Sequence, residues 1–197
     1  MDEAWRSFVT VVSGLPRSGT SLLMQMLRSG GLPVLADDGR APDEDNPRGY
    51  LEYEPVKALR ADASFVPRAV GRAVKVVHAL LDALPAGLDY RVVFMERDLD
   101  EVLRSQRRML ERGGRAGARI PDERLRAVFA QQVARALERL AADGRTAVLR
   151  VPYADLVRDP RPWAARVADF LGGGLDVGAM AAAVDPRLYR QRSTPAT

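Results

Sequence analysis

The sequence of 197 residues contains no cysteine and a single histidine, His78. Without cysteine the chain can form neither disulfides nor thiolate metal sites, and one histidine excludes a histidine-rich metal centre. No apolar run approaches the roughly 20 residues that a membrane-spanning helix needs. The first residues, MDEAWRSF, are acidic and lack the basic start of a signal peptide. We therefore expect a cytoplasmic protein without a metal site or a membrane association.

Lysine is also scarce: it occurs only at Lys57 and Lys75, so arginine supplies nearly all of the positive charge. The formal net charge is +4, and the basic residues are interleaved with acidic ones. A nucleic-acid groove calls for a basic stripe with interleaved aromatic residues, so the pattern favours a small anionic ligand instead. Apolar residues make up 47% of the chain, which is enough for the core of a single domain over residues 1–197.

Short apolar runs alternate with helical patterns along the chain. We expect strands over residues 8–14, 72–77, 90–95 and 146–151, with a further short strand over 33–36. We expect helices over residues 19–29, 99–111, 121–142 and 161–171, and a partly helical segment over 50–59. This alternation predicts an α/β fold with three layers, α/β/α, around a central parallel sheet. Ligands of such sheets bind beyond the carboxyl ends of the strands.

The loop after the first expected strand has the composition of an anion site. Gly14 and Gly19 have the spacing of a nucleotide-binding P-loop, but Thr20 stands where that loop has its lysine. A strand, loop and helix in this order aim backbone N–H groups and the positive end of the helix dipole at one point. An ordinary turn would account for the glycines, but not for Arg17 and three hydroxyls within five residues. The missing lysine makes ATP or GTP hydrolysis the less favoured interpretation.

The segment PRSGTS, residues 16–21, resembles the 5′-phosphosulfate loop of the sulfotransferases, usually written P-[KR]-S-G-T-[ST]. Those enzymes use 3′-phosphoadenosine 5′-phosphosulfate (PAPS) and have a P-loop NTPase-like α/β fold. The resemblance implies that this loop holds the 5′-phosphate and its sulfonate. The residues implied in binding are Arg17, Ser18, Gly19, Thr20 and Ser21.

Two further segments resemble the same family. Sulfotransferases bind the 3′-phosphate with an arginine at a strand end and a serine eight residues later, and MERDLDEVLRSQ supplies Arg97 and Ser105 at this spacing. The arginine guanidinium donates two parallel hydrogen bonds to a phosphate, and the serine hydroxyl donates one more. Arg108, one helical turn further on, is placed to add positive charge.

The segment LRVPYADLVRDP resembles the family's L-x-[YV]-E-D-L-x-x-D-P stretch. The resemblance implies that Tyr153 lies near the adenine or the 3′-phosphate. Simple packing of this tyrosine on the sheet is equally compatible with the sequence.

The closing R-K-G-x-x-G-D-W-K segment of the cytosolic sulfotransferases has no counterpart here. Arg187, Arg190 and Arg192 are candidates to replace it. An alternative function is therefore a degenerate P-loop kinase or NTPase, and another is a non-catalytic relative that binds an adenosine nucleotide.

Sulfonate transfer needs a base for the proton of the acceptor, and two residues compete for this role. Glu52 lies in NPRGYLE, which resembles the N-P-x-G-Y-x-E segment of bacterial and tyrosylprotein sulfotransferases. His78 lies in KVVHALLDALP, which resembles K-T-H-L-P-x-x-L-L-P of the cytosolic enzymes, but with one extra residue between Lys75 and His78. That offset turns a side chain to the opposite face of an extended strand unless a bulge corrects it. We favour Glu52 and expect Lys75 to neutralise charge on the sulfonate.

The acceptor is expected to be a small molecule or a carbohydrate. Its pocket would be built from loops such as residues 37–47 and 113–120, whose shapes no sequence motif fixes.

Overall fold

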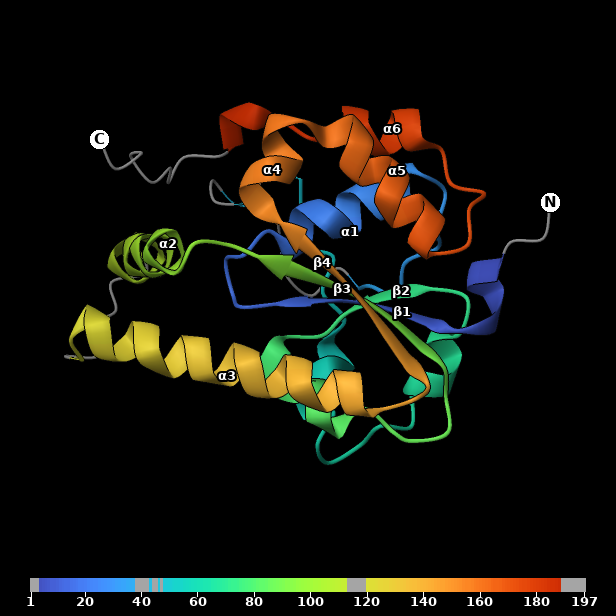
Figure 1. The fold of residues 1–197 in the computed structure, drawn as a ribbon, viewed down its shortest axis with the longest axis horizontal. Coiled ribbons are helices and arrows are strands. Elements are labelled where there is room, and N and C mark those ends of the chain that lie inside the picture. Colours follow the sequence, from blue (N-terminus) through green and yellow to red (C-terminus); the bar gives the residue numbers. More distant parts are fainter. Residues whose placement is uncertain (1–3, 38–42, 44–45, 47, 113–119, 189–197) are drawn as a thin grey trace.

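The computed structural model describes residues 4–37, 43, 46, 48–112 and 120–188. Four parallel strands form a sheet in the order β2-β1-β3-β4 (Figure 1). The strands are β1 (Val9–Gly14), β2 (Ala73–Lys75), β3 (Tyr90–Glu96) and β4 (Thr146–Pro152). Val11 of β1 faces Val74 of β2 on one side and Val92 of β3 on the other. The carboxyl ends of all four strands therefore meet at one edge of the sheet.

Helices cover both faces of this sheet. The α-helices are α1 (Thr20–Ser29), α2 (Leu99–Arg112), α3 (Asp122–Ala142), α4 (Tyr153–Arg158), α5 (Pro160–Phe170) and α6 (Val177–Ala182). The 3₁₀ turns are η1 (Ala4–Ser7), η2 (Glu54–Ala58), η3 (Val66–Ala69), η4 (His78–Ala83) and η5 (Pro186–Leu188). In Figure 1, α1, α4, α5 and α6 lie on one side of the sheet, α3 lies on the other, and α2 lies beyond the carboxyl ends of the strands. The predicted α/β/α architecture around a parallel sheet is confirmed.

The three layers enclose two apolar cores, one on each face of the sheet. Successive side chains of a strand point to opposite faces, so β1 contributes to both cores. Val12 packs in the core shared with α1 and α4–α6, whereas Val9 and Val11 pack in the core shared with η2–η4 and α3. Every residue of β1 is buried, which fixes the loop that follows it on a rigid support.

The structure differs from the sequence prediction in the region beside β2. Residues 33–36 do not form a strand: Val34 makes an isolated parallel bridge to Ala73, with Leu35 N donating to Ala73 O at 2.7 Å. The strand expected over residues 72–77 is only three residues long, because the chain turns into η4 at His78. None of the described helices is both long and apolar enough to span a membrane.

Candidate functional site

The loop between β1 and α1 is tightly folded against neighbouring elements. Arg17 has a left-handed backbone with φ 75°, which is uncommon for a residue other than glycine. Gly19 has φ 103°, and a Cβ built there would lie 2.4 Å from a ring carbon of Tyr153. Only glycine fits at this position. Backbone strain of this kind is concentrated at functional sites, so the geometry is consistent with a ligand-binding loop.

Two sequence segments that lie far apart in the chain meet at this loop. The Arg17 Nε donates a hydrogen bond to the Ser105 Oγ at 2.9 Å, and the Arg97 Nη1 donates to the Arg17 carbonyl oxygen at 3.0 Å. The Arg97 Nε also donates to the Glu101 carboxylate at 2.9 Å, in an ion pair whose side chains are only 8% and 3% exposed. Arg17 of the predicted phosphosulfate loop therefore lies in one hydrogen-bonded cluster with Arg97 and Ser105, the predicted 3′-phosphate pair. The cluster contains two guanidinium groups.

Tyr153 belongs to the same cluster. Its ring is buried at the start of α4, and the Arg97 guanidinium lies 4.5 Å from the ring centroid, a cation–π geometry. The Gln106 Nε2 donates to the Pro16 carbonyl oxygen at 3.3 Å, which ties α2 to the loop a second time. The predicted residues at the ends of β1, β3 and β4 thus converge.

The three hydroxyl residues of the loop have different surroundings. Ser18 is buried, and within the described part of the chain its Oγ has no hydrogen-bond partner. Thr20 and Ser21 are the first two residues of α1, where backbone N–H groups have no acceptor within the helix. The Ser21 Oγ accepts a hydrogen bond from the Lys75 Nζ at 3.0 Å. The loop therefore presents N–H donors, hydroxyls and a positive charge together.

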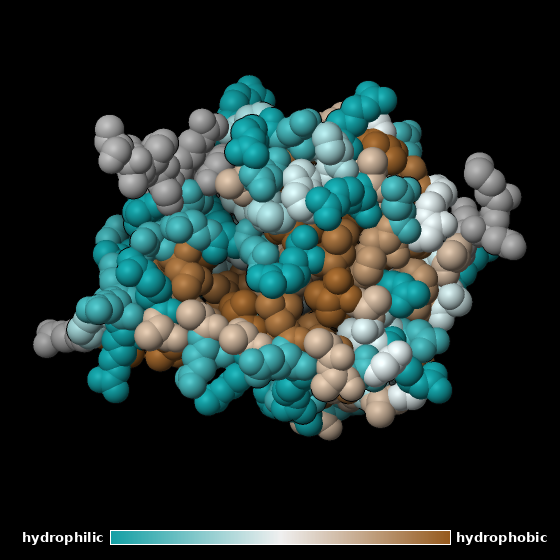
Figure 2. All heavy atoms as spheres, viewed as in Figure 1, coloured by the Kyte–Doolittle hydropathy of each residue, from teal (hydrophilic) through white to brown (hydrophobic). Residues whose placement is uncertain are grey.

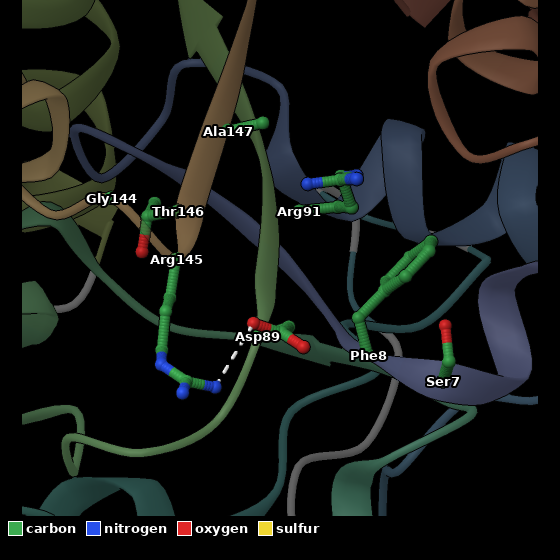
Figure 3. A pocket seen from close by; sticks show the side chains of 8 residues that line it. All are labelled: Ser7, Phe8, Asp89, Arg91, Gly144, Arg145, Thr146 and Ala147. Atoms are coloured by element: carbon green, nitrogen blue, oxygen red, sulfur yellow. Dashed lines mark ion pairs between the residues drawn. The ribbon is translucent and has the colours of Figure 1, made fainter.

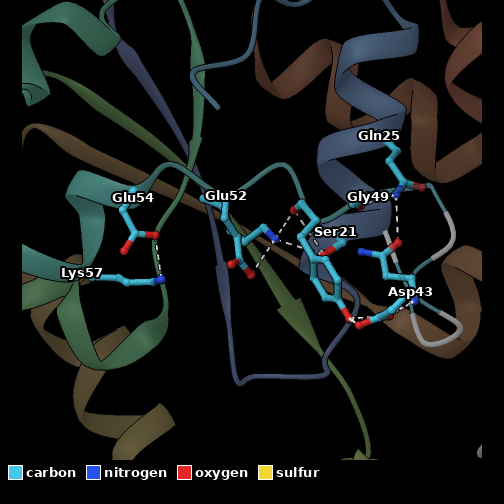
Figure 4. Close-up of polar contacts among 10 residues, drawn as sticks. Ser21, Gln25, Asp43, Gly49, Glu52, Glu54 and Lys57 are labelled. Atoms are coloured by element: carbon cyan, nitrogen blue, oxygen red, sulfur yellow. Dashed lines mark hydrogen bonds and ion pairs between the residues drawn. The ribbon is translucent and has the colours of Figure 1, made fainter. Parts of the chain in front are cut away.

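Glu52 and Lys75 lie beside the start of α1. The Lys75 Nζ is 3.6 Å from the Glu52 Oε1, and it also donates to the Tyr50 carbonyl oxygen. Figure 4 shows the contacts that link Ser21 and Glu52 in this region. The Lys75 side chain is only 11% exposed, whereas that of Glu52 is 33% exposed, so the carboxylate is accessible. Leu51, next to Glu52, has φ 49°.

His78 lies on the other face of the sheet. The residue is 7% exposed, and its Nε2 is 3.1 Å from the Gln132 Oε1 of α3. The Nδ1 is buried and makes no hydrogen bond to any described residue. Lys75 contacts Ser21 of α1, and Glu52 pairs with Lys75. The two candidate bases, Glu52 and His78, therefore lie on opposite sides of the sheet.

Some predicted contributors do not enter the cluster. Arg187 pairs with Asp185, and its hydrogen bond lowers the pKa of the Asp185 carboxyl to about 2. Arg190 and Arg192 lie outside the described residues, as do most of the two loops expected to shape the acceptor pocket. Arg108 is exposed on α2.

Glu101 and Gln106 also contact the cluster, and neither was among the predicted site residues. Arg97 precedes α2 and Glu101 lies in its first turn, so their pairing depends on how the chain enters the helix. Gln106 had no local signal in the sequence, since its partner is a backbone carbonyl of a distant loop. No group of three or more acidic or histidine side chains in the described part of the chain is placed to hold a metal ion.

A pocket of about 330 Å³ lies at the opposite edge of the sheet, at the amino ends of the strands. Figure 3 shows Phe8, Asp89, Arg91 and Arg145 around it, with an ion pair of 3.5 Å between Asp89 and Arg145. Its position separates it from the loop cluster by the length of the strands, so it does not contribute to the site described above.

Comparison with known proteins gives a consistent result. A sequence model of the sulfotransferase family matches residues 72–176, more than half of the chain. No curated protein sequence matches. The sulfotransferase domain of the olefin synthase from Synechococcus PCC 7002 is a structural neighbour with a TM-score of 0.58 and 20% identity, covering 96% of this chain and 89% of that domain. The sulfotransferase domain of the curacin biosynthetic pathway has a TM-score of 0.51 and 18% identity, covering 96% and 93% of the two chains. At these identities the likeness shows a common fold.

Proposed function

The chain belongs to the sulfotransferase family, and we propose that it transfers a sulfonate group from PAPS to a hydroxyl or amine of an acceptor. PAPS supplies the activated sulfonate as a phosphosulfate anhydride. In the transfer, the acceptor oxygen or nitrogen forms a bond to sulfur while the bond from sulfur to the 5′-phosphate oxygen breaks. The acceptor proton goes to a base of the protein, and 3′-phosphoadenosine 5′-phosphate (PAP) leaves.

The observation that carries this proposal is the joining of Arg17, Arg97 and Ser105 in one hydrogen-bonded cluster. PAPS has two separate phosphate groups on one ribose, so its site needs two separate cationic groups at a fixed distance. A guanidinium is well suited to each, since it donates paired hydrogen bonds to phosphate oxygens. The cluster supplies one guanidinium from the loop and one from the end of β3.

Several features of the loop fit the phosphosulfate end of PAPS. The N-terminus of α1, at Thr20 and Ser21, favours negative charge. The Ser18 hydroxyl has no hydrogen-bond partner among the described residues, so it would donate to a ligand oxygen. Lys75, held against Ser21 at 3.0 Å, would stabilise the charge that develops on the transferring group. Tyr153, stacked under Arg97, would border the nucleoside.

We favour Glu52 as the base. Its carboxylate is accessible and lies 3.6 Å from the same ammonium that contacts Ser21 of the loop helix, so it is close to the place where the sulfonate would be held. His78 is the competing base, and its nearly complete burial against Gln132 argues for a packing role. The alternative of an ATP-dependent kinase or NTPase is disfavoured because Thr20 replaces the lysine that would clamp the β- and γ-phosphates.

The 3′-phosphate assignment is tested by replacing Arg97 and comparing two nucleotides. Arg97→Ala should weaken PAP binding about tenfold to hundredfold, the size of a lost charge-assisted hydrogen bond, while 5′-AMP binding changes little. Arg145→Ala controls for the loss of one positive charge, because it removes the same charge from an exposed side chain at the opposite edge of the sheet. Equal losses for PAP and 5′-AMP, measured by calorimetry, would refute the assignment.

A further inference from the structure

We infer that Glu101 is a positioning residue of the proposed nucleotide site: its buried carboxylate fixes the direction in which the Arg97 guanidinium meets the 3′-phosphate. This inference rests on the proposed sulfonate transfer from PAPS. It adds a residue that does not touch the ligand, but on which the discrimination between PAP and 5′-AMP depends.

Glu101 differs from the charged residues that follow it in α2, because its side chain points inward. Arg104, Arg107, Arg108 and Glu111 are all exposed, and Figure 2 shows a hydrophilic surface over this helix. Glu101 is only 2% exposed. Burial of a charged carboxylate is costly unless the charge is paired, so the partner of Glu101 accounts for its inward position.

The partner is the Arg97 guanidinium. The Arg97 Nε donates to the Glu101 Oε2 at 2.9 Å, and the two side chains are 8% and 3% exposed. The Arg97 Nη1 donates to the Arg17 carbonyl oxygen at 3.0 Å, and the Tyr153 ring lies against the guanidinium, with 4.5 Å from its carbon to the ring centroid. These three contacts fix both the position and the plane of the guanidinium. Paired hydrogen bonds to a phosphate depend on that plane, so Glu101 helps to set the geometry of binding.

Two other roles for Glu101 fit the structure less well. A carboxylate in the first turn of a helix can cap the N–H groups there. In α2 this task falls to Asp98, whose Oδ1 accepts hydrogen bonds from the backbone N–H groups of Asp100 and Glu101, each at 3.1 Å. A carboxylate could also contact the ligand, but it would repel a phosphate. The nearly complete burial of Glu101 leaves no surface for such a contact.

The same face of α2 holds the second guanidinium of the cluster. Ser105 lies four residues after Glu101, and residues at this spacing share one face of a helix. Ser105 is 6% exposed, and its Oγ accepts a hydrogen bond from the Arg17 Nε at 2.9 Å. Each guanidinium is therefore held at its Nε by a residue of α2, and Glu101 is the residue that holds Arg97.

The test measures the binding of PAP and 5′-AMP to variants of the full chain by calorimetry. Glu101→Ala removes both the charge and the hydrogen-bond acceptor, and PAP binding should weaken about five- to tenfold while 5′-AMP binding changes by less than about twofold. The effect is smaller than that of Arg97→Ala because the arginine remains. Glu101→Gln removes the charge but keeps an oxygen that accepts from the Arg97 Nε, so PAP should bind at least as tightly as to the wild-type protein.

Glu96→Gln is the matched control for the loss of a negative charge near Arg97. Glu96 directly precedes Arg97, and its carboxylate accepts hydrogen bonds from Arg150. This variant should not weaken PAP binding. Tighter PAP binding in both Glu101 variants would mean that Glu101 only reduces the positive charge of the site, and it would overturn the inference.

A double variant separates positioning from a general structural role. In the Arg97→Ala background, Glu101→Ala should cause no further loss of PAP affinity, because the guanidinium that it positions is absent. A further loss in the double variant would overturn the inference. Equal losses for PAP and 5′-AMP in Glu101→Ala alone would do the same.

If Glu101→Ala does not fold, the wild-type protein still provides a test. In NMR spectra of the nucleotide-free protein, the Arg97 Nε–H should exchange with water more slowly than the Nε–H groups of exposed arginines, because it is buried and hydrogen-bonded. Arg97→Lys identifies its signal. Exchange as fast as that of the exposed arginines would overturn the inference.

The wild-type titration separates this inference from the proposed function. If the wild-type protein binds PAP no more tightly than 5′-AMP, the proposed function fails and the role of Glu101 falls with it. If the wild-type protein selects PAP and Glu101→Ala selects it equally well, the role of Glu101 alone is refuted.

Discussion

At the residue scale, the site depends on glycine at one position of close approach. Gly19→Ala would place a Cβ 2.4 Å from the Tyr153 ring at a φ of 103°, so we expect a loss of about 1–3 kcal/mol in the free energy of unfolding together with weaker PAP binding. Thermal or denaturant unfolding measures the first effect and calorimetry the second.

Gly31→Ala is the matched control for this substitution. Gly31 has a similar φ of 95°, but a Cβ there meets no atom within 4 Å. The Gly31→Ala variant should therefore lose only the stability that the positive-φ backbone conformation costs a residue with a Cβ. If both variants lose the same stability and Gly19→Ala keeps its affinity for PAP, the contact with Tyr153 is irrelevant to the site.

The choice of base is also decided at single residues. Glu52→Gln should reduce the rate of sulfonate transfer about 10²–10⁴-fold, the usual contribution of a general base, while the affinity for PAP stays the same. His78→Gln should retain most of the rate, because its ring is packed against Gln132 rather than beside Lys75. Single-turnover kinetics with labelled PAPS would compare the two, and the reverse pattern would assign the base to His78.

Local spacing in the sequence singled out residues that the fold places next to one another, and their roles in binding stay predictions. The PRSGTS segment and the pair Arg97 and Ser105 were predicted, and the structure brings them into contact. The buried pairing of Arg97 with Glu101 and the hydrogen bond from Gln106 to the loop were missed. These contacts depend on how α2 is placed against the loop, which is a property of the tertiary fold.

At the scale of elements, η4 is held beside the region after η2 by an exposed ion pair. The Arg60 guanidinium donates two hydrogen bonds to the Asp82 carboxylate, at 3.0 and 2.7 Å, and this lowers the pKa of Asp82. A lowered pKa in the folded state means that the stabilisation is present above the ordinary carboxyl pKa. It is lost as the pH falls through the lowered value.

Asp82→Asn should therefore cost less than about 1 kcal/mol in the free energy of unfolding at neutral pH, since the pair is exposed. The difference between the wild-type protein and the variant should shrink as the pH falls below about 4, the ordinary pKa of an aspartate, and should vanish once the pH is below the lowered pKa of folded Asp82. Denaturant unfolding at several pH values measures this. A difference that grows on acidification would contradict the sign of the pKa shift.

Helices with a long periodic pattern were predicted, whereas the two shortest α-helices were not. The 21-residue α3 follows the expected range within one residue. By contrast, α4 and α6 have six residues each, too few to show a helical period. Their apolar residues, Leu156 and Val157 in α4 and Met180 in α6, are buried in the core over α1, so tertiary packing is what stabilises these helices.

At the scale of the whole molecule, the parallel sheet accounts for the position of the site. Parallel strands bring their carboxyl ends to one edge, so residues from three distant segments, around Arg17, Arg97 and Tyr153, meet there. The alternation of strands and helices predicted this edge.

The central claim is that the whole chain binds the 3′,5′-bisphosphate nucleotide of a sulfotransferase. The most direct measurement is calorimetric titration of the purified protein with PAP, ATP and 5′-AMP, each with and without Mg²⁺. We expect micromolar binding of PAP that is independent of Mg²⁺ and much tighter than that of ATP or 5′-AMP, because Arg17 and Arg97 lie where two separate phosphates would be held. Preferential, Mg²⁺-dependent binding of ATP would contradict it and favour a kinase-like function.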